Sequence, residues 1–247
     1  MPSVYLSPST QEKNLYVIGG TEEYYMNRVA DAMEPYLEAS DIAFGRNTPQ
    51  MTAASSIRQG NAGNYDLYLA IHSNASPDNM YGQLMGTDVF YYPTSVNGRR
   101  FAQLIEQNME AVYPRPELVD IRATTALGEV RQTKMPAVLV EVAYHDNRED
   151  ADWIVDNIEP IGETLAKSVA EYFGVPFVRP AAGETGTVTL TGGSLNIRSA
   201  PSPNAPIINR AYNGDRVLIL GEDGDWYKVN FAGRPGFAVK RYISRNS

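Results

Sequence analysis

The stretch Pro136–Asn147, with the sequence Pro-Ala-Val-Leu-Val-Glu-Val-Ala-Tyr-His-Asp-Asn, decides the fold of the first part of the chain. Its run of apolar, often β-branched residues is typical of a strand that is buried on both faces of a parallel sheet. A single carboxylate, Glu141, stands in the middle of this run. Because burying an ionised carboxylate without a partner is costly, a glutamate in a core strand normally has a cation, a metal or a strong donor beside it.

Two interpretations of Glu141 follow from this position. It lies either at the end of the strand, where it reaches solvent or the N-terminus of a helix, or at a functional site. In the second case it is a general base or a metal-site carboxylate at the carboxyl edge of the sheet, where ligands bind in open α/β folds. We favour the functional interpretation.

The segments around this strand alternate between strand-like and helix-like patterns. Three segments have apolar residues at helical spacing: Met26, Val29, Met33 and Leu37; then Phe101, Leu104, Ile105, Met109 and Val112; and then Ile154, Ile158, Ile161, Leu165 and Val169. A kink is expected in the third helix at Pro160. Short apolar runs predict further strands at residues 4–7, 42–45, 66–74 and 86–92. The alternation predicts an α/β domain over residues 1–175, with a mostly parallel sheet flanked by helices.

The pattern changes after residue 175. Residues 176–185 are rich in Pro, Ala and Gly without periodicity, which predicts a linker. Residues 186–247 then contain short strand-like runs separated by turns with Gly or Pro, a pattern that predicts a small all-β barrel. The chain is therefore expected to contain two domains.

The composition of the 247-residue chain excludes several functions. With 21 Lys and Arg against 29 Asp and Glu, the net charge of −8 would repel nucleic acid. The absence of cysteine excludes disulfides and thiolate metal sites. No stretch approaches the roughly 20 apolar residues of a membrane span, and no signal peptide is visible. The only histidines are His72 and His145, which limits any metal site.

Three side chains together suggest a metal-dependent hydrolase. Glu22 shares the apolar stripe of its helix and is expected to face inward, whereas His72 lies at the end of a strand. With Glu141 they supply two carboxylates and an imidazole. A catalytic zinc site typically has two histidines and a carboxylate as ligands, an open position for water and a separate carboxylate base. Each residue alone also has a structural explanation; for Glu22 this is the helix dipole.

Residues 1–175 resemble the zinc-dependent N-acetylmuramoyl-L-alanine amidases of the amidase type three family. Four segments carry the resemblance in the order and spacing of the family: Leu6–Glu12, Gly20–Asn27, Leu69–Ala75 and Pro136–Asn147. The resemblance implies hydrolysis of the amide bond between N-acetylmuramic acid and L-alanine in peptidoglycan. It also implies that Glu22 and His72 bind Zn²⁺, and that Glu141 is the catalytic glutamate, a general base and then a general acid.

One position departs from the family pattern. The first histidine ligand of the family follows the first strand, but this chain has Lys13 there, and a protonated lysine has no lone pair for zinc. Three hypotheses remain open. His145 replaces the missing ligand, or Glu22 and His72 form a weaker site with Glu12 or water. Alternatively, zinc is lost, and the protein is a catalytically degenerate peptidoglycan-binding protein.

A further candidate lies just before the core strand. Arg131 could hold a carboxylate of the substrate, although an arginine that faces solvent would have the same sequence context.

The C-terminal segment Gly186–Ile243 resembles bacterial SH3-like domains. Four stretches carry this second resemblance: Gly193–Ser202, Val217–Glu222, Asp225–Val229 and Gly236–Ile243. Such domains accompany cell-wall hydrolases and usually bind peptidoglycan peptides. We hypothesise that a groove near Tyr212, Trp226 and Tyr242 holds a stem peptide. The function that the two resemblances imply would place the protein in the cell wall or outside the cell.

Overall fold

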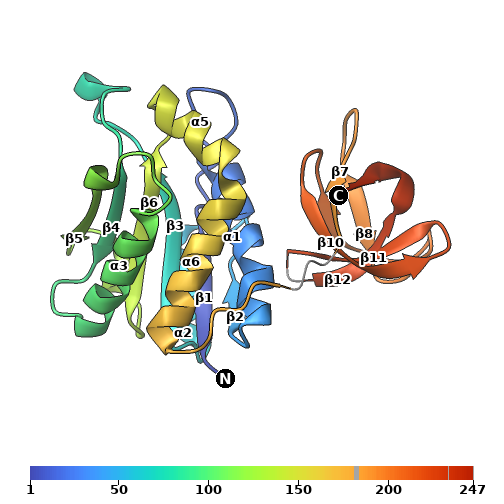
Figure 1. The fold of residues 1–247 in the computed structure, drawn as a ribbon, viewed down its shortest axis with the longest axis horizontal. Helices are drawn as coiled ribbons and strands as arrows, with labels where there is room; N and C mark the ends of the chain where they lie inside the picture. The colour runs from blue at the N-terminus through green and yellow to red at the C-terminus, as the bar shows by residue number, and fades with distance from the viewer. Residues whose placement is uncertain (181–183, 233, 247) are drawn as a thin grey trace. The chain divides into compact units, whose positions relative to one another are not determined.

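The computed structural model describes residues 1–180, 184–232 and 234–246, which form two compact units, Met1–Arg179 and Pro180–Ser247. The boundary falls inside the predicted linker 176–185, of which residues 181–183 lie outside the described residues. Figure 1 shows a layered α/β fold in the first unit and β-structure in the second. Each unit has a hydrophobic core of its own.

A six-stranded sheet forms the centre of the first unit, in the order β2-β1-β3-β6-β4-β5. The strands are β1 (Ser3–Pro8), β2 (Ala43–Arg46), β3 (Leu67–Asn74), β4 (Thr87–Tyr91), β5 (Val119–Ala123) and β6 (Ala137–Tyr144). Because β6 runs parallel to β3 and antiparallel to β4, the sheet is mixed but mostly parallel. The predicted fold class is confirmed, although β5 was not predicted.

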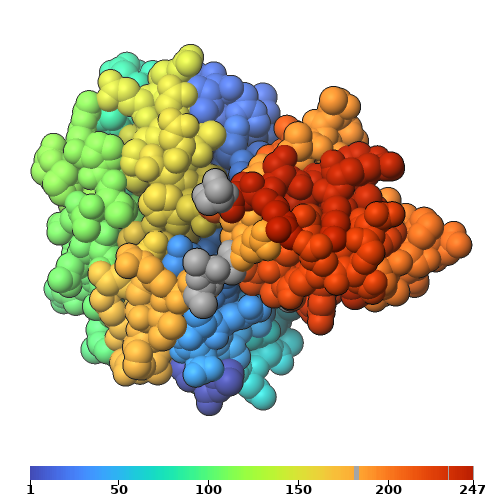
Figure 2. Space-filling model, turned by 45° about the vertical axis from the view of Figure 1, so that its right-hand side comes forward, coloured from blue at the N-terminus to red at the C-terminus, as the bar shows by residue number. Residues whose placement is uncertain are grey.

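Helices cover both faces of this sheet. They are α1 (Glu22–Ala39), α2 (Ala53–Ala62), α3 (Val96–Met109), α4 (Gly128–Arg131), α5 (Arg148–Asp156) and α6 (Ile158–Phe173), with 3₁₀ turns at Asp78–Met80 and Pro116–Leu118. On one face α6 packs against α1 and α3. The surface view shows the segment that contains α5 and α6, coloured yellow to orange, between green and blue segments (Figure 2). The short helices α2 and α4 contact each other beside the opposite face.

Side chains alternate between the two faces along each strand, which divides the core into two parts. The main core contains Leu67, Leu69 and Ile71 of β3, and Val138, Val140 and Val142 of β6. The smaller core contains the intervening residues Tyr68, Ala70, Ala137 and Leu139, together with Val130 of α4. His72 and Glu141 continue this second series and are partners in the register of β3 and β6. Both therefore face the side of the sheet that carries α2 and α4.

The helix after β6 is interrupted earlier than the sequence predicted. Asn147 caps α5 by accepting hydrogen bonds from backbone N–H groups of the first turn. The helical segment is interrupted at Asn157, so α5 and α6 are separate helices. The prediction of one continuous helix with a kink at Pro160 was therefore wrong. Pro160 lies in the first turn of α6, where its missing N–H costs no hydrogen bond.

The second unit is a sheet of seven strands in the order β13-β7-β10-β11-β12-β8-β9. Its strands are β7 (Thr185–Val188), β8 (Leu195–Arg198), β9 (Ile207–Ala211), β10 (Arg216–Asp223), β11 (Trp226–Phe231), β12 (Arg234–Val239) and β13 (Ile243–Arg245), with a 3₁₀ turn at Lys240–Tyr242. The predicted all-β domain is confirmed; β9 and β13 were not predicted. Among the described helices of the chain, none is long and apolar enough to cross a membrane.

Candidate functional site

A cavity of about 480 Å³ lies on the side of the sheet that carries α2 and α4. Its lining combines Ser7–Gln11 at the end of β1, residues 47–57 around the start of α2, and Leu127–Glu129 at the start of α4. His72 and Glu141 complete it from the central strands. The volume is within the range of small-molecule sites, and the lining combines hydroxyl, amide and apolar groups with two carboxylates and one imidazole.

The imidazole of His72 lies between two carboxylates. Its Nδ1 is 2.9 Å from Oε1 of Glu22, and its Nε2 is 2.9 Å from Oε2 of Glu129. All three residues are buried. Since a carboxylate can only accept, each ring nitrogen donates a hydrogen bond, and the metal-free site holds an imidazolium between two anions.

Local structure fixes both carboxylates. Glu22 is the first residue of α1, directly after the N-cap Thr21, and its Oε2 accepts a hydrogen bond of 2.7 Å from Nδ2 of Asn14. Glu129 lies in α4, and its Oε1 accepts hydrogen bonds from Ser7 of β1 at 2.6 Å and from Tyr68 of β3 at 2.8 Å. The arrangement therefore joins α1, α4, β1 and β3.

The electrostatics of this cluster follow from its contacts. Burial alone would raise the pKa of Glu22 and Glu129, but the hydrogen bonds and charge of His72 outweigh it and lower both pKa values. Burial alone would lower the pKa of His72, but the hydrogen bonds of Glu129 and Glu22 raise it well above its ordinary value. The cluster is therefore charged at neutral pH.

Glu141 lies in the same cavity without such support. Its Oε2 is buried and has no hydrogen-bond partner in the structure. Burial, together with the carboxylates of Glu22 and Asp88, raises the pKa of Glu141 to about 7, although the positive charge of His72 opposes this shift. A carboxyl group with such a pKa can accept and return a proton at neutral pH.

The contacts of His145 are with Ser73 and Tyr16. Its Nδ1 is 3.0 Å from the backbone oxygen of Ser73 and 3.1 Å from the Ser73 hydroxyl, and its ring stacks on Tyr16 with centroids 5.3 Å apart. Since a carbonyl oxygen only accepts, Nδ1 carries a proton. Ser73 follows His72 in β3 and belongs to the opposite face of the strand. The structure thus places His145 beside Ser73 and Tyr16.

The residues directly after His145 form hydrogen bonds to the loop between β3 and β4. Asp146 accepts hydrogen bonds from the backbone N–H groups of Ser76 and Gly82, and Asn147 donates one to the carbonyl oxygen of Gly82. The stretch His145–Asn147 therefore fastens the segment that connects β3 and β4.

Lys13 and Arg131 are both exposed. Within the described segment after β1, it is Asn14, next to Lys13, that donates to Glu22. Arg131 ends α4 and is not among the described residues that line the cavity. The structure thus brings Glu22, His72 and Glu141 together and leaves the roles of His145 and Arg131 as predictions.

The described donors offer a zinc ion at most two ligands in one place. Oε1 of Glu22 and Nδ1 of His72 face each other at 2.9 Å, a hydrogen-bond distance, and an ion contacting both would displace the Nδ1 proton and move the two atoms apart. A third protein ligand is not evident, because no three His, Cys, Asp or Glu residues in the described parts of the chain are arranged to hold a metal. The remaining positions would fall to water, substrate or a repositioned His145.

Glu129 is the residue of this cluster that the sequence analysis missed. The segment Leu127–Arg131 drew attention only to Arg131, since a helix of four residues has no periodicity that shows which side chain faces inward. The available signal was a carboxylate between Leu127 and Val130, shortly before the core strand.

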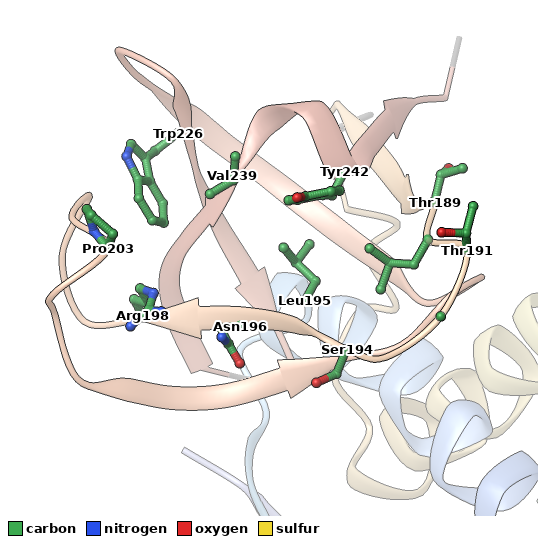
Figure 3. Close-up of a pocket in the computed structure, with 12 residues that line it drawn as sticks. Thr189, Thr191, Ser194, Leu195, Asn196, Arg198, Pro203, Trp226, Val239 and Tyr242 are labelled. Carbon is green, nitrogen blue, oxygen red and sulfur yellow. The ribbon is translucent and has the colours of Figure 1, made fainter.

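The second unit contains a groove of about 570 Å³. Trp226, Arg198 and Pro203 lie at one end, Leu195 and Tyr242 in the middle, and Thr189 and Thr191 at the other (Figure 3). Arg198 donates a hydrogen bond of 2.7 Å to the carbonyl oxygen of Ala205. Of the three aromatic residues that the sequence predicted here, Trp226 and Tyr242 line the groove. The third, Tyr212, is not among the described lining residues and is 52% exposed.

Comparisons with known proteins agree with this architecture. A family model described as N-acetylmuramoyl-L-alanine amidase matches residues 11–171. The chain belongs to this amidase family. A model of the bacterial SH3 domain matches residues 193–244.

Two curated proteins are similar in sequence to part of this chain. An uncharacterised protein of Clostridium perfringens (strain 13 / Type A) is 26% identical over 175 residues, which cover 67% of this chain and 51% of that protein. The endolysin of Bacillus phage SPP1 is 27% identical over 120 residues, covering 46% of this chain and 42% of the endolysin. The chain spans about half the length of the curated relatives it matches.

A solved amidase shares the fold of the first unit. The catalytic domain of CwlV, an N-acetylmuramoyl-L-alanine amidase from Bacillus (Paenibacillus) polymyxa var. colistinus, aligns with a TM-score of 0.63 and 19% identity. The alignment covers 71% of this chain and 100% of that domain.

The raised pKa of Glu141 predicts a pH-dependent stability of the metal-free protein. The unfolded chain releases this proton near pH 4.5 and the folded chain near pH 7, so stability should fall between these values by roughly 3 kcal/mol and then level off. Glu141→Gln should lack this decrease. Urea unfolding of both proteins in EDTA from pH 4 to pH 8 measures the difference, and parallel curves would show that Glu141 has an ordinary pKa.

Proposed function

We propose that the protein hydrolyses the amide bond between N-acetylmuramic acid and L-alanine in peptidoglycan, and that the cavity containing Glu141 is the active site. The observation that carries the proposal is Oε2 of Glu141, a buried carboxylate oxygen without a partner beside the charged His72. Membership of the amidase family and the similarity to a phage endolysin support the same reaction. Such an enzyme would act at the cell wall or outside the cell.

In this mechanism Glu22 and His72 would hold a zinc ion, with Nδ1 of His72 and Oε1 of Glu22 as donors. A bound zinc ion would polarise the scissile carbonyl group and lower the pKa of a water molecule. Glu141 would take a proton from the attacking water and return it to the leaving amine of L-alanine. A pKa near 7 suits both steps, since neither protonation state is strongly disfavoured at neutral pH.

A second function is favoured by Lys13. It stands at the position of the first histidine ligand in the resembled family, and the described residues provide two facing donors rather than three. A protein without zinc would be a catalytically degenerate peptidoglycan-binding protein. Against this alternative, the buried Glu141, with one oxygen unpartnered, costs stability that binding alone does not require.

The first test is the variant Glu141→Gln. We expect amide hydrolysis to fall by roughly 10²–10⁴-fold, because the variant cannot transfer the proton, while its zinc content stays that of the unchanged protein. New amino termini of L-alanine released from purified sacculi measure the activity. Glu34→Gln, which changes a buried carboxylate paired with Arg46, is the matched control. Undiminished turnover would remove Glu141 from the mechanism.

The second test concerns the third zinc ligand. Lys13→His is expected to raise zinc affinity roughly tenfold or more, because it adds an imidazole where the resemblance places a ligand. Elemental analysis and chelator competition give the stoichiometry and affinity. The same measurements on His145→Ala show whether this residue is the replacement ligand, as zinc should then be lost. If neither the unchanged protein nor Lys13→His binds zinc, the binding-protein alternative is the better one.

We further propose that the SH3-like unit binds the stem peptide of peptidoglycan in the groove between Trp226 and Tyr242. An aromatic wall and a neighbouring guanidinium group, that of Arg198, suit a peptide with a free carboxylate. Arg131 of the first unit, exposed at the end of α4, stays a second candidate for binding a substrate carboxylate.

Trp226→Ala should weaken retention of the protein on purified sacculi. Truncating an aromatic residue that anchors an interface typically costs about 1–4 kcal/mol, so the dissociation constant should rise roughly fivefold or more. Tyr212→Ala, outside the groove, is the control and should bind as before. Equal losses in both variants, or in neither, would place the binding surface elsewhere; a chain lacking residues 184–247 gives the retention due to the first unit.

A further inference from the structure

Arg122 is an arginine of β5 to which the proposed reaction gives no role, and it lies on the same face of the sheet as Glu141. Asp88 of β4 pairs with Glu141 in the antiparallel register, and Asp120 of β5 pairs with Asp88 in the parallel one. Arg122 follows two residues after Asp120, so its side chain belongs to this face as well. The side chain of Arg122 is 54% exposed, so a ligand can reach its guanidinium group from solvent.

A buried carboxylate orients this guanidinium group. Nε of Arg122 lies 2.7 Å from Oδ1 of Asp88, and Nη2 lies 3.5 Å from Oδ2 of Asp120. Asp88 is held in turn, because its Oδ2 accepts hydrogen bonds from the hydroxyl of Tyr144 at 3.2 Å and from Nδ2 of Asn74 at 3.3 Å. A guanidinium group has five N–H donors, so Arg122 keeps donors for a ligand while Asp88 holds it.

We propose that Arg122 binds the carboxylate of the second residue of the stem peptide, while the sugar occupies the cavity on the other side of Glu141. The inference rests on the proposed function, in which the amide bond beside Glu141 joins the sugar to L-alanine. In peptidoglycan the residue after L-alanine is commonly D-glutamate, whose α-carboxyl group is either free or amidated. Arg122 would favour the form with a free carboxylate.

The spacing of the sheet suits this assignment. Neighbouring strands are about 4.8 Å apart, so Asp88 lies one strand away from Glu141, and the backbone of Arg122 lies two strands away. Because the side chain of Arg122 reaches back to Asp88, its guanidinium group lies roughly 5–10 Å from Glu141. An extended peptide advances roughly 3.3–3.6 Å per residue, so the carboxylate of the second residue falls within this span.

The two sides of Glu141 also differ in charge. The cavity extends from β6 toward β1 and α2, whereas β4 and β5 lie on the other side of β6 (Figure 1). Its described lining contains no lysine or arginine but includes the ionised Glu129, so a peptide carboxylate would be repelled there. The side with Arg122 is therefore the better place for the acidic part of the substrate.

Asn47 gives the cavity a feature that suits a neutral sugar. Its Nδ2 donates to the carbonyl oxygen of Pro8 and to the hydroxyl of Ser56, both at 2.9 Å, which fixes the orientation of the amide. Its Oδ1 is buried and has no hydrogen-bond partner within the described part of the chain. A hydroxyl or acetamido N–H of the sugar would supply the missing donor.

Binding of two muramyl dipeptides tests the inference. N-acetylmuramyl-L-alanyl-D-glutamate and its D-isoglutamine counterpart differ in the free or amidated α-carboxyl group. The full-length Glu141→Gln protein keeps both ligands intact, and ¹H–¹⁵N NMR titration gives both dissociation constants. We expect the acidic ligand to bind at least roughly fivefold more tightly than the amidated one, and Arg122→Gln in this background to reduce the ratio to about one.

The ratio is the readout because a purely structural effect of Arg122→Gln would weaken both ligands alike. Combining Arg122→Gln with Asp88→Asn removes the carboxylate that has lost its arginine, and should give the same low ratio. Arg148→Gln removes another exposed arginine that pairs with a carboxylate, Asp152, and should keep the original preference. A preference that survives Arg122→Gln, or that is absent from the Glu141→Gln protein, would overturn the inference.

The outcomes separate this inference from the proposed function. If the unchanged protein releases L-alanine amino termini from sacculi but no preference depends on Arg122, only the role of Arg122 fails. If the preference depends on Arg122 but no amide is hydrolysed, the carboxylate site stands and the hydrolase proposal fails. A Glu141→Gln protein that binds neither ligand would overturn the inference, whatever the result with sacculi.

Discussion

The first domain depends on one ionic interaction, the imidazolium of His72 held between the carboxylates of Glu22 and Glu129. Three ionised groups are buried together here, and each would be costly to bury alone. Their mutual hydrogen bonds, with further donors from Asn14, Ser7 and Tyr68, compensate for the lost hydration. The cluster also connects a helix start, a short helix and two strands, so the fold and the site are stabilised by the same contacts.

Glu141 contrasts with this cluster. It shares the cavity and the register of His72, yet one of its oxygens has no partner. The positive imidazolium lowers its pKa less than burial and the neighbouring carboxylates raise it. Two kinds of carboxyl group therefore lie close together: ionised groups that hold His72, and a group with a pKa of about 7 and one unpartnered oxygen.

Much of this arrangement follows from sequence patterns, and the remainder has identifiable physical reasons. Glu141 and His72 were predictable because each lies within or at the end of a long apolar strand, and Glu22 because it shares a helical stripe. Glu129 was not, since α4 is too short for periodicity and its partners lie about 60 and 120 residues away in sequence. The contacts of His145 with Ser73 and Tyr16 likewise depend on tertiary structure. In the second domain the short strands β9 and β13 lacked a pattern strong enough to identify them.

The alternation of side chains along β3 places neighbouring residues in different chemical environments. His72 faces the cavity, whereas Ser73, the next residue, meets Tyr16 and His145 on the other side. A shift of this strand by one residue would exchange the two faces, sending the imidazole into the packing layer and the serine into the cavity. The site therefore tolerates insertions in the loops around β3 far better than within it. The length of this strand therefore decides which side chains line the cavity.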